Sequence, residues 1–583
     1  MRKFPLMATA AVATVAMATA SGGSAGALKT AESAGSVSGL SSSVTRPDLG
    51  SEYVVLYSPG ASIATVKGAI TASGGILVSN NTQLGYAVAR SASASFATKM
   101  DKSPAVLGAA RNRVVGVAPR LVKARSGDVE RLDSERRAGG LTTTAEKAAP
   151  TTPAIPLAEP LANRQWDMRQ IGATPAGSYA RQPGKAGVLV GVIDTGIDGT
   201  HPDIEANFDA ARSRNFVTDI PSIDGPCETP SCVDPANVDD DGHGTHVAST
   251  IASPINNLGI AGVAPKVTVV NLRAGQDSGF FFLAATLAAL TYAGDIGVDV
   301  VNMSFFTDPW LFNCTSNPAD SPVEQTEQRV IREATQRAIN YARGHGVLPI
   351  AAEGNEATDL GDPTTDTTSP DFPIDAAKPR TIDNSCITVP TESNGVIAVS
   401  STGISTRKAF YSNYGTEQTD VSAPGGDSYD SPDNTSDPRN NILAAYPERL
   451  AKLAGELNPD GTPNTPFVVR DCKGTECGYY QYLQGTSMAA PHAVGVAALI
   501  VSEFGEADRR HGGLKLAPAA TAKILAESAV DHPCPEPRLF HYTRIRANGA
   551  VVQEDAFCAG PAKDNGFYGE GIVNAYAAVT SRR

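Results

Sequence analysis

The chain has no excess of positive charge. Its 583 residues include 48 Lys and Arg against 61 Asp and Glu, which gives a formal net charge of −13. Nucleic acids and anionic membranes repel a surface of this sign, so the composition argues against both as partners. The length predicts more than one folding unit and is ample for a large core.

Long apolar runs are also missing, except at the N-terminus. Residues 1–27 begin Met1-Arg2-Lys3, continue through an apolar stretch from Leu6 to Ala20 and end in small residues. A basic start, an apolar stretch too short to span a bilayer and a small-residue cleavage site predict a secretory signal peptide. We therefore expect a secreted, extracellular protein without a membrane partner after processing.

Cysteine is absent from the first 226 residues. The eight cysteines lie at Cys227, Cys232, Cys314, Cys386, Cys472, Cys477, Cys534 and Cys558. An even number in an exported chain favours disulfides over metal sites. Two pairs close short polar loops and should bond locally. The predicted pairs are Cys227 with Cys232, Cys472 with Cys477, Cys314 with Cys386 and Cys534 with Cys558.

Several familiar hydrolase and metal motifs are missing too. Residues 485–489 do not match G-x-S-x-G, which excludes the nucleophile turn of the α/β-hydrolases. His243 and His246 lack the glutamate and the spacing of a zinc-protease helix. The stretch from Asn237 begins like an EF-hand calcium loop but has Ala248 at the twelfth position, where that loop needs glutamate.

A compact pattern of strands and helices is present at residues 52–117, after a Ser-, Gly- and Ala-rich stretch. Its expected strands and helices, in the order βαββαβ, cover residues 53–57, 61–72, 75–78, 84–88, 92–102 and 114–117. This order describes a small ferredoxin-like α+β unit. An independent domain with no catalytic role would show the same pattern.

The composition changes over residues 121–160. Charged residues crowd Leu121 to Arg137, and Thr, Ala and Pro dominate as far as Pro160. These features predict an exposed linker, in which Ser134 to Arg137 would suit a trypsin-like processing enzyme. A solvated run of charges is the simpler interpretation of the same residues.

From residue 161 the pattern is that of an α/β domain. Strand-like apolar runs and helical stretches alternate, at 188–193, 245–253, 267–272, 281–292, 298–305, 324–343, 347–352 and 396–400. β-Branched strands between helices predict a mostly parallel sheet covered on both faces, and so a three-layer domain. In such sheets the functional site lies beyond the carboxyl ends of the strands.

Three stretches can carry chemistry at those strand ends. Ser487 lies at or near the start of a helical run, where free N–H groups suit an oxyanion, and Pro491 should fall in its first turn. Asp194 follows an apolar strand and can orient a histidine. His243 begins a helix between two glycines, which allow close approach. The simpler roles are a helix cap for Ser487, a turn cap for Asp194 and a turn residue for His243.

Taken together, these stretches resemble the signatures of the subtilisin-like serine proteases. The matching segments are Asp194 to Asp198, His243 to Ala248 and Gly485 to His492. Their Asp, His, Ser order is that of subtilisin. The resemblance implies that Ser487 is the nucleophile, that His243 is the general base and acid, and that Asp194 orients His243.

The resemblance also implies a domain plan. Residues 52–117 are similar to the inhibitory propeptide of the family, so the expected order is signal peptide 1–27, propeptide 28–120, linker with processing sites 121–160 and peptidase domain 161–583. The expected partners are polypeptide substrates and the chain's own propeptide, which acts as intramolecular inhibitor and chaperone. We expect a monomeric zymogen.

Further site residues follow from the same resemblance. Asn355 matches the asparagine that completes the oxyanion hole with the Ser487 N–H. Ser304 and Gly279 match the two edges that bind an extended peptide. The family continues after Ser304 with glycines, whereas Phe305 and Phe306 follow here, which predicts a narrower pocket.

A structural calcium ion is the only metal that the resemblance suggests, and no cofactor is expected for the chemistry. Asp203 and Asn256 match family ligands, and carbonyl groups in residues 254–260 could complete an oxygen shell. A turn cap is the alternative role of Asp203.

The predicted function is a secreted serine endopeptidase that works through a Ser487 acyl-enzyme. One alternative is a catalytically silent secreted protein of the same fold that binds peptides, and a second is a peptidase dedicated to one protein substrate. Long insertions at 213–240, 359–386 and 426–480 are expected to form surface loops that set specificity.

Overall fold

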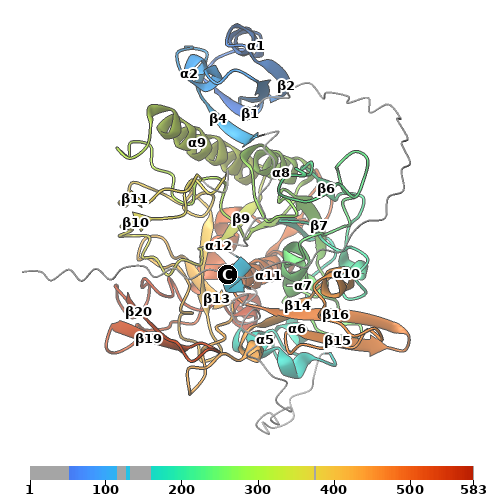
Figure 1. Cartoon of the computed structure of the whole chain (residues 1–583). Helices are drawn as coiled ribbons and strands as arrows, with labels where there is room; N and C mark the ends of the chain where they lie inside the picture. The colour runs from blue at the N-terminus through green and yellow to red at the C-terminus, as the bar shows by residue number, and fades with distance from the viewer. Residues whose placement is uncertain (1–50, 115–126, 131–158, 373–375, 582–583) are drawn as a thin grey trace, which may run out of the picture. The chain divides into compact units, whose positions relative to one another are not determined.

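The computed structural model describes residues 51–114, 127–130, 159–372 and 376–581. The predicted signal peptide, residues 28–50 and the possible processing site at Ser134 to Arg137 lie outside these ranges. Figure 1 shows the whole chain with its helices and strands labelled.

The N-terminal unit is the expected ferredoxin-like fold. Its elements are β1 (Ser51–Tyr57), α1 (Ile63–Ala72), β2 (Ile76–Asn81), β3 (Tyr86–Ser91), α2 (Phe96–Met100) and β4 (Val106–Val114). The strands form an antiparallel sheet in the order β2-β3-β1-β4. The predicted position of the last strand, residues 114–117, is wrong. β4 ends where it was expected to begin, because pairing with β1 holds the polar sequence Ala109 to Arg113 in extended form.

One face of this small sheet packs on two helices of the larger domain, α8 (Leu283–Ile296) and α9 (Pro322–Gly344). Val54 and Leu56 share a buried apolar cluster with Val330 of α9. Asn112 accepts a hydrogen bond from the Ala284 N–H at 2.6 Å, which satisfies a free donor in the first turn of α8. The contact therefore combines apolar burial with helix capping.

The centre of the larger domain is a seven-stranded parallel sheet, as predicted. Its order is β13-β12-β9-β8-β5-β7-β6. The strands are β5 (Leu189–Ile193), β6 (Arg214–Asn215), β7 (Thr268–Arg273), β8 (Val300–Met303), β9 (Leu348–Ala352), β12 (Ile397–Thr402) and β13 (Val421–Pro424). β5, which ends just before Asp194, lies between β7 and β8.

Helices cover both faces of this sheet, which gives the expected three layers (Figure 1). α7 (His243–Ala252) and α11 (Thr486–Phe504) share one apolar core with strand residues such as Val190 and Val192. α8 and α9 pack on the opposite face, against residues such as Ile193 and Val301. The alternation of side chains along β5 therefore separates the two cores.

The other elements surround these layers. The helices are α3 (Gly127–Glu130), α5 (Trp166–Gln170), α6 (Ser178–Arg181), α10 (Glu448–Leu453), α12 (Pro518–Glu527) and α13 (Ala575–Thr580). The strands are β10 (Thr365–Asp366), β11 (Arg380–Thr381), β14 (Ile442–Ala445), β15 (Val468–Lys473), β16 (Glu476–Leu483), β17 (Glu506–Ala507), β18 (Leu514–Lys515), β19 (Leu539–Ile545) and β20 (Val551–Phe557).

All four predicted disulfides are confirmed. The bonds join Cys227 to Cys232, Cys314 to Cys386, Cys472 to Cys477 and Cys534 to Cys558. Three of them fix the insertions that were expected to be surface loops, since they lie in or at the ends of 213–240, 359–386 and 426–480.

Within the described residues, one helix is long and apolar enough to cross a membrane by length and composition, contrary to the expectation that only the N-terminus approaches this length. This helix is α11, and 89% of its most apolar window is buried inside the protein. Its apolar composition therefore reflects its place in the core beneath the sheet.

Candidate active site

Asp194 and His243 meet as the sequence predicts. Asp194 follows β5 and is fully buried, and its Oδ1 lies 2.7 Å from Nδ1 of His243, the first residue of α7. Gly244 permits this approach, since a Cβ atom there would lie 2.1 Å from the carbonyl oxygen of Gly196. The bond holds Nε2 of the imidazole on the side away from Asp194, where it lies 3.6 Å from Oε2 of Glu130.

Asp239 joins the two motifs, a role that the sequence reasoning missed. Its Oδ1 accepts bonds from the Thr195 hydroxyl and the Gly242 N–H, and its Oδ2 accepts from the N–H and hydroxyl of Thr245. Asp239 therefore caps α7 and ties it to the strand end that carries Asp194. The repeated acids before Gly242 are the available signal for such a role.

Ser487 is the second residue of α11 and is 4% exposed. Pro491 was wrongly expected in the first turn. The helix begins at Thr486, so Pro491 is an interior residue whose missing N–H leaves the Ser487 carbonyl without its usual helical donor. The Ser304 hydroxyl donates to this carbonyl at 3.0 Å. Ser304 thus lies beside Ser487 and compensates for the proline.

Asn355 follows β9 and contacts the start of α11. Its side-chain oxygen accepts bonds from the N–H and the hydroxyl of Thr486, each at 2.9 Å. These bonds fix the orientation of the amide, so that its NH2 group faces the site. A preorganised donor in this position is what an oxyanion hole requires.

A carboxylate from the predicted linker occupies the space between these groups. Glu130, the last residue of α3, accepts the Ser487 hydroxyl at Oε1 (2.7 Å) and the Asn355 amide at the same oxygen (3.3 Å). Its Oε2 lies 3.6 Å from Nε2 of His243. Glu130 is 8% exposed, so this part of the linker is buried and not exposed as predicted.

The backbone of the linker is also held at the site. The Glu130 carbonyl accepts the Gln484 N–H at 3.1 Å, and the Val129 carbonyl accepts the Gln484 side-chain amide at 2.9 Å. Val129 packs against the core that contains α11. No sequence signal distinguishes Glu130 from the other acids of the linker.

The electrostatics of the site favour a charged imidazole. Burial alone would lower the pKa of His243, but the carboxylates of Asp194 and Glu130 together hold that pKa well above its usual range. A protonated imidazole cannot accept a proton from Ser487. Glu130 therefore disfavours the neutral imidazole that could accept this proton.

The two predicted substrate edges differ in their surroundings. Ser304 contacts the Ser487 carbonyl, whereas Gly279 lies in an exposed turn with φ +81°, where an added Cβ would meet no atom within 4 Å. The bulky residues after Ser304 have partners in the fold. Phe305 stacks on Phe281 with ring centroids 4.1 Å apart, and Phe306 packs on a separate apolar cluster that includes Phe312.

Asp203 and Asn256, the predicted calcium ligands, are in contact. The Asn256 amide nitrogen lies 3.3 Å from Oδ1 of Asp203, and the Ile260 N–H donates to Oδ2 at 3.1 Å. The carboxylate thus faces donors rather than the six to eight oxygens that calcium prefers. As arranged here, these residues do not fit the ion, and calcium at this pair stays a prediction.

Comparisons with known proteins agree with this geometry. Residues 185–540, more than half of the chain, match the model of the subtilase family, Peptidase S8. A thermophilic serine proteinase of Bacillus sp. (strain AK1) is 29% identical over 321 residues, which cover 55% of this chain and 53% of that protein. Subtilisin DY of Bacillus licheniformis is 27% identical over 319 residues, which cover 55% of this chain and 78% of that protein.

A solved structure shows the same fold over a longer range. The epidermin leader peptide processing serine protease of Staphylococcus aureus aligns with 91% of this chain and 99% of its own, with a TM-score of 0.58 and 21% identity. The chain spans about half the length of the AK1 proteinase and 39% of fervidolysin from Fervidobacterium pennivorans. The family match, together with the Asp194, His243 and Ser487 arrangement, shows that the chain belongs to the subtilase family of serine endopeptidases.

Proposed function

We propose that this chain hydrolyses peptide bonds through an acyl-enzyme on Ser487 and that it is made as a zymogen. The observation that carries the proposal is the set of three groups around one carboxylate. His243, Ser487 and Asn355 contact the Glu130 carboxylate, and Asp194 bonds the far side of the His243 ring. A carboxylate held by a serine hydroxyl and an amide resembles the oxyanion of acyl transfer.

Each residue has a defined part in the reaction. His243 accepts the Ser487 proton at Nε2 as Oγ attacks the substrate carbonyl, and Asp194 stabilises the imidazolium that forms. The Asn355 amide and the Ser487 N–H hold the negative oxygen. The imidazolium then protonates the leaving amine, and water releases the acyl group by the same route. The subtilase family needs no cofactor for these steps.

Glu130 supports the zymogen part of the proposal. In the precursor its carboxylate takes the Ser487 hydrogen bond, occupies the Asn355 amide and, together with Asp194, raises the pKa of His243. A separate polypeptide substrate can bind only after the linker leaves. The ferredoxin-like unit, packed on α8 and α9, would hold the linker in place until cleavage, in keeping with a role as intramolecular inhibitor and chaperone.

The location and substrates form a further part of the proposal. Four disulfides suit an oxidising, extracellular compartment, which supports export through the predicted signal peptide. We propose polypeptides as substrates and a monomeric enzyme. A second candidate is a peptidase for one protein substrate. The ordered packing of Phe305 on Phe281 favours it, since it places fixed aromatic rings just after Ser304.

Labelling with a fluorophosphonate tests the proposed chemistry, because only an activated serine reacts. Processed wild-type protein should carry one adduct that peptide mass mapping assigns to Ser487, while the Ser487→Ala and His243→Ala chains should carry none. Labelling together with hydrolysis of unfolded casein supports a general peptidase. Labelling without casein hydrolysis favours the dedicated peptidase. An unlabelled, folded and processed wild type would instead support the silent peptide-binding protein.

A further inference from the structure

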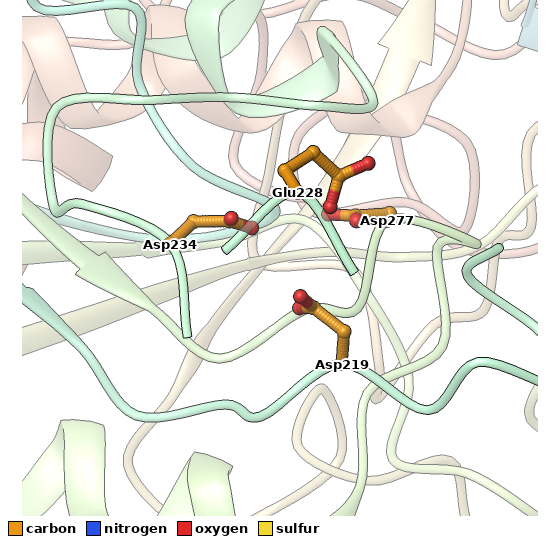
Figure 2. Close-up of side chains that lie close together, drawn as sticks. All are labelled: Asp219, Glu228, Asp234 and Asp277. Atoms are coloured by element: carbon orange, nitrogen blue, oxygen red, sulfur yellow. The ribbon is translucent and has the colours of Figure 1, made fainter. Parts of the chain in front are cut away.

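Four acidic side chains outside the catalytic site converge on one point. Asp219, Glu228 and Asp234 belong to the insertion after β6, and Asp277 follows β7. Each offers one oxygen atom, and these oxygens all lie within 4.8 Å of one another. Figure 2 shows the four carboxyl groups pointing towards a shared centre. Crowded acids occur on many protein surfaces without a ligand, so this convergence alone assigns nothing.

Asp219 supplies a second and independent observation. The residue is 4% exposed, and neither oxygen of its carboxylate accepts a hydrogen bond from any described residue. The guanidinium of Arg273 lies 3.8 Å from Oδ1, which is too far for a hydrogen bond. Burial of a carboxylate without hydrogen bonds costs free energy unless another group compensates. This carboxylate points into the cluster (Figure 2).

Arg273 does not balance the cluster by itself. It is fully buried and bonds Asp234 at 2.9 Å as well as Asp277. One guanidinium against the four acids leaves a formal charge of −3, that is, +1 and −4. The crowding is also seen in the pKa values, because burial and the Asp234 carboxylate raise the pKa of Asp219 to about 6.

We propose that Asp219, Glu228, Asp234 and Asp277 bind one calcium ion. An all-carboxylate oxygen set suits a hard divalent cation. Two oxygens on opposite sides of calcium lie about 4.6–5.2 Å apart, and those on magnesium only about 4.0–4.2 Å apart. The four oxygens lie within 4.8 Å of one another, which fits calcium, whereas magnesium keeps several of its waters and is rarely bound by protein oxygens alone. The ion adds positive charge to that of Arg273 and gives the Asp219 carboxylate, which accepts no hydrogen bond from a described residue, a direct ligand contact.

The site connects to segments that matter for catalysis. The Cys227–Cys232 disulfide closes a short loop that contains Glu228 and lies between Asp219 and Asp234 in the sequence. It therefore shortens the segment that must be ordered when the ion binds. Asp277 begins the turn that contains Gly279, one of the predicted substrate edges. Ala274 and Gly275, next to Arg273, both donate their N–H groups to the Asp194 carbonyl at 3.0 Å. Calcium would therefore stabilise the insertion between Asp194 and His243 together with one wall of the substrate site.

Calcium binding can be measured without enzyme activity. The full-length Ser487→Ala chain, stripped with EDTA and dialysed, is titrated with CaCl2 by calorimetry, and its melting temperature is recorded with and without calcium. The variants Asp219→Asn and Glu228→Gln are made in this background. Asp203→Asn is the matched control, since it removes a buried acid from the other predicted calcium pair.

We expect saturable binding at the four-acid cluster that weakens at least tenfold in Asp219→Asn and Glu228→Gln and is unchanged in Asp203→Asn. The calcium-dependent gain in melting temperature should fall in the same two variants. Because Glu228 is exposed, Glu228→Gln carries the test if Asp219→Asn does not fold. The proposal is overturned if the parent chain binds no calcium at millimolar concentration or if both variants keep its affinity. Binding of MgCl2 as tight as that of CaCl2 would overturn the choice of calcium.

Discussion

Replacement of Glu130 should activate the precursor without any cleavage. The Ser487 hydroxyl donates to the Glu130 carboxylate at 2.7 Å, and a hydrogen bond to a charged group contributes about 1.5–3 kcal/mol. Each 1.36 kcal/mol changes a rate tenfold. The Glu130→Ala precursor should therefore react with a small fluorophosphonate about 10- to 150-fold faster than the wild-type precursor. Glu130→Gln keeps an acceptor oxygen but loses the charge, so its rate should lie between the two.

The assay follows label in the full-length band on a denaturing gel during the first minutes, which separates the precursor from processed enzyme. Glu417→Gln is the matched control, because it removes the same charge from an exposed surface of the peptidase domain. Its rate should equal that of wild type, and all four chains should melt at similar temperatures. If the Glu130→Ala precursor labels no faster than wild type, Glu130 does not block the site and the reasoning fails.

Five further predictions concern the site and the fold. Asn355→Ala should lower kcat on a peptide substrate by about 10²- to 10³-fold with little change in KM, because the oxyanion donor acts only in the transition state. The rise of labelling with pH should lie at higher pH in the wild-type precursor than in Glu130→Ala, since Glu130 helps to raise the pKa of His243. For the same reason, the stability that protonated His243 gives the precursor is present at low pH and is lost as pH rises through its folded-state pKa, which denaturant titrations at several pH values can check. Ser304→Ala should lower the free energy of unfolding by about 1–3 kcal/mol, measured in urea, because the Ser487 carbonyl loses its donor. Removal of the Cys314–Cys386 bond, which closes 72 residues, should cost about 4 kcal/mol, against about 2 kcal/mol for the five-residue Cys227–Cys232 loop.

Much of the fold was predictable because its signals are local. β-Branched runs such as 188–193 can only be buried strands, and β5 confirms that run within one residue. The Cys472–Cys477 pair was predictable because its short hairpin leaves few partners in reach. The last strand of the ferredoxin-like unit was misplaced because β4 contains Gly108 and polar residues, and its strand conformation comes from pairing with β1.

The site was predictable in part, for a related reason. The triad and Asn355 follow strand ends or begin helices, so sequence patterns locate them. The role of Glu130 depends on a contact with Ser487, which is more than 350 residues away in the sequence. The residues next to Glu130 in the sequence do not indicate this contact. Asp219 and Asp277 likewise come from different segments, and only the fold brings them together. The Ser304 hydroxyl donates to the Ser487 carbonyl in place of the N–H that Pro491 lacks. This is another contact between distant residues that a helix pattern cannot reveal.

The measurement that tests the central claim most directly is N-terminal mapping of the purified wild-type and Ser487→Ala chains, both expressed as precursors. The account predicts that wild type loses residues up to a cut within 121–165, while Ser487→Ala keeps its linker intact. That result would show that Ser487 cleaves a peptide bond in its own chain. If both chains are cut at the same position, another protease makes the cut. If neither chain is cut and the Glu130→Ala precursor is not labelled by the fluorophosphonate, the claim that Ser487 is a working nucleophile is contradicted.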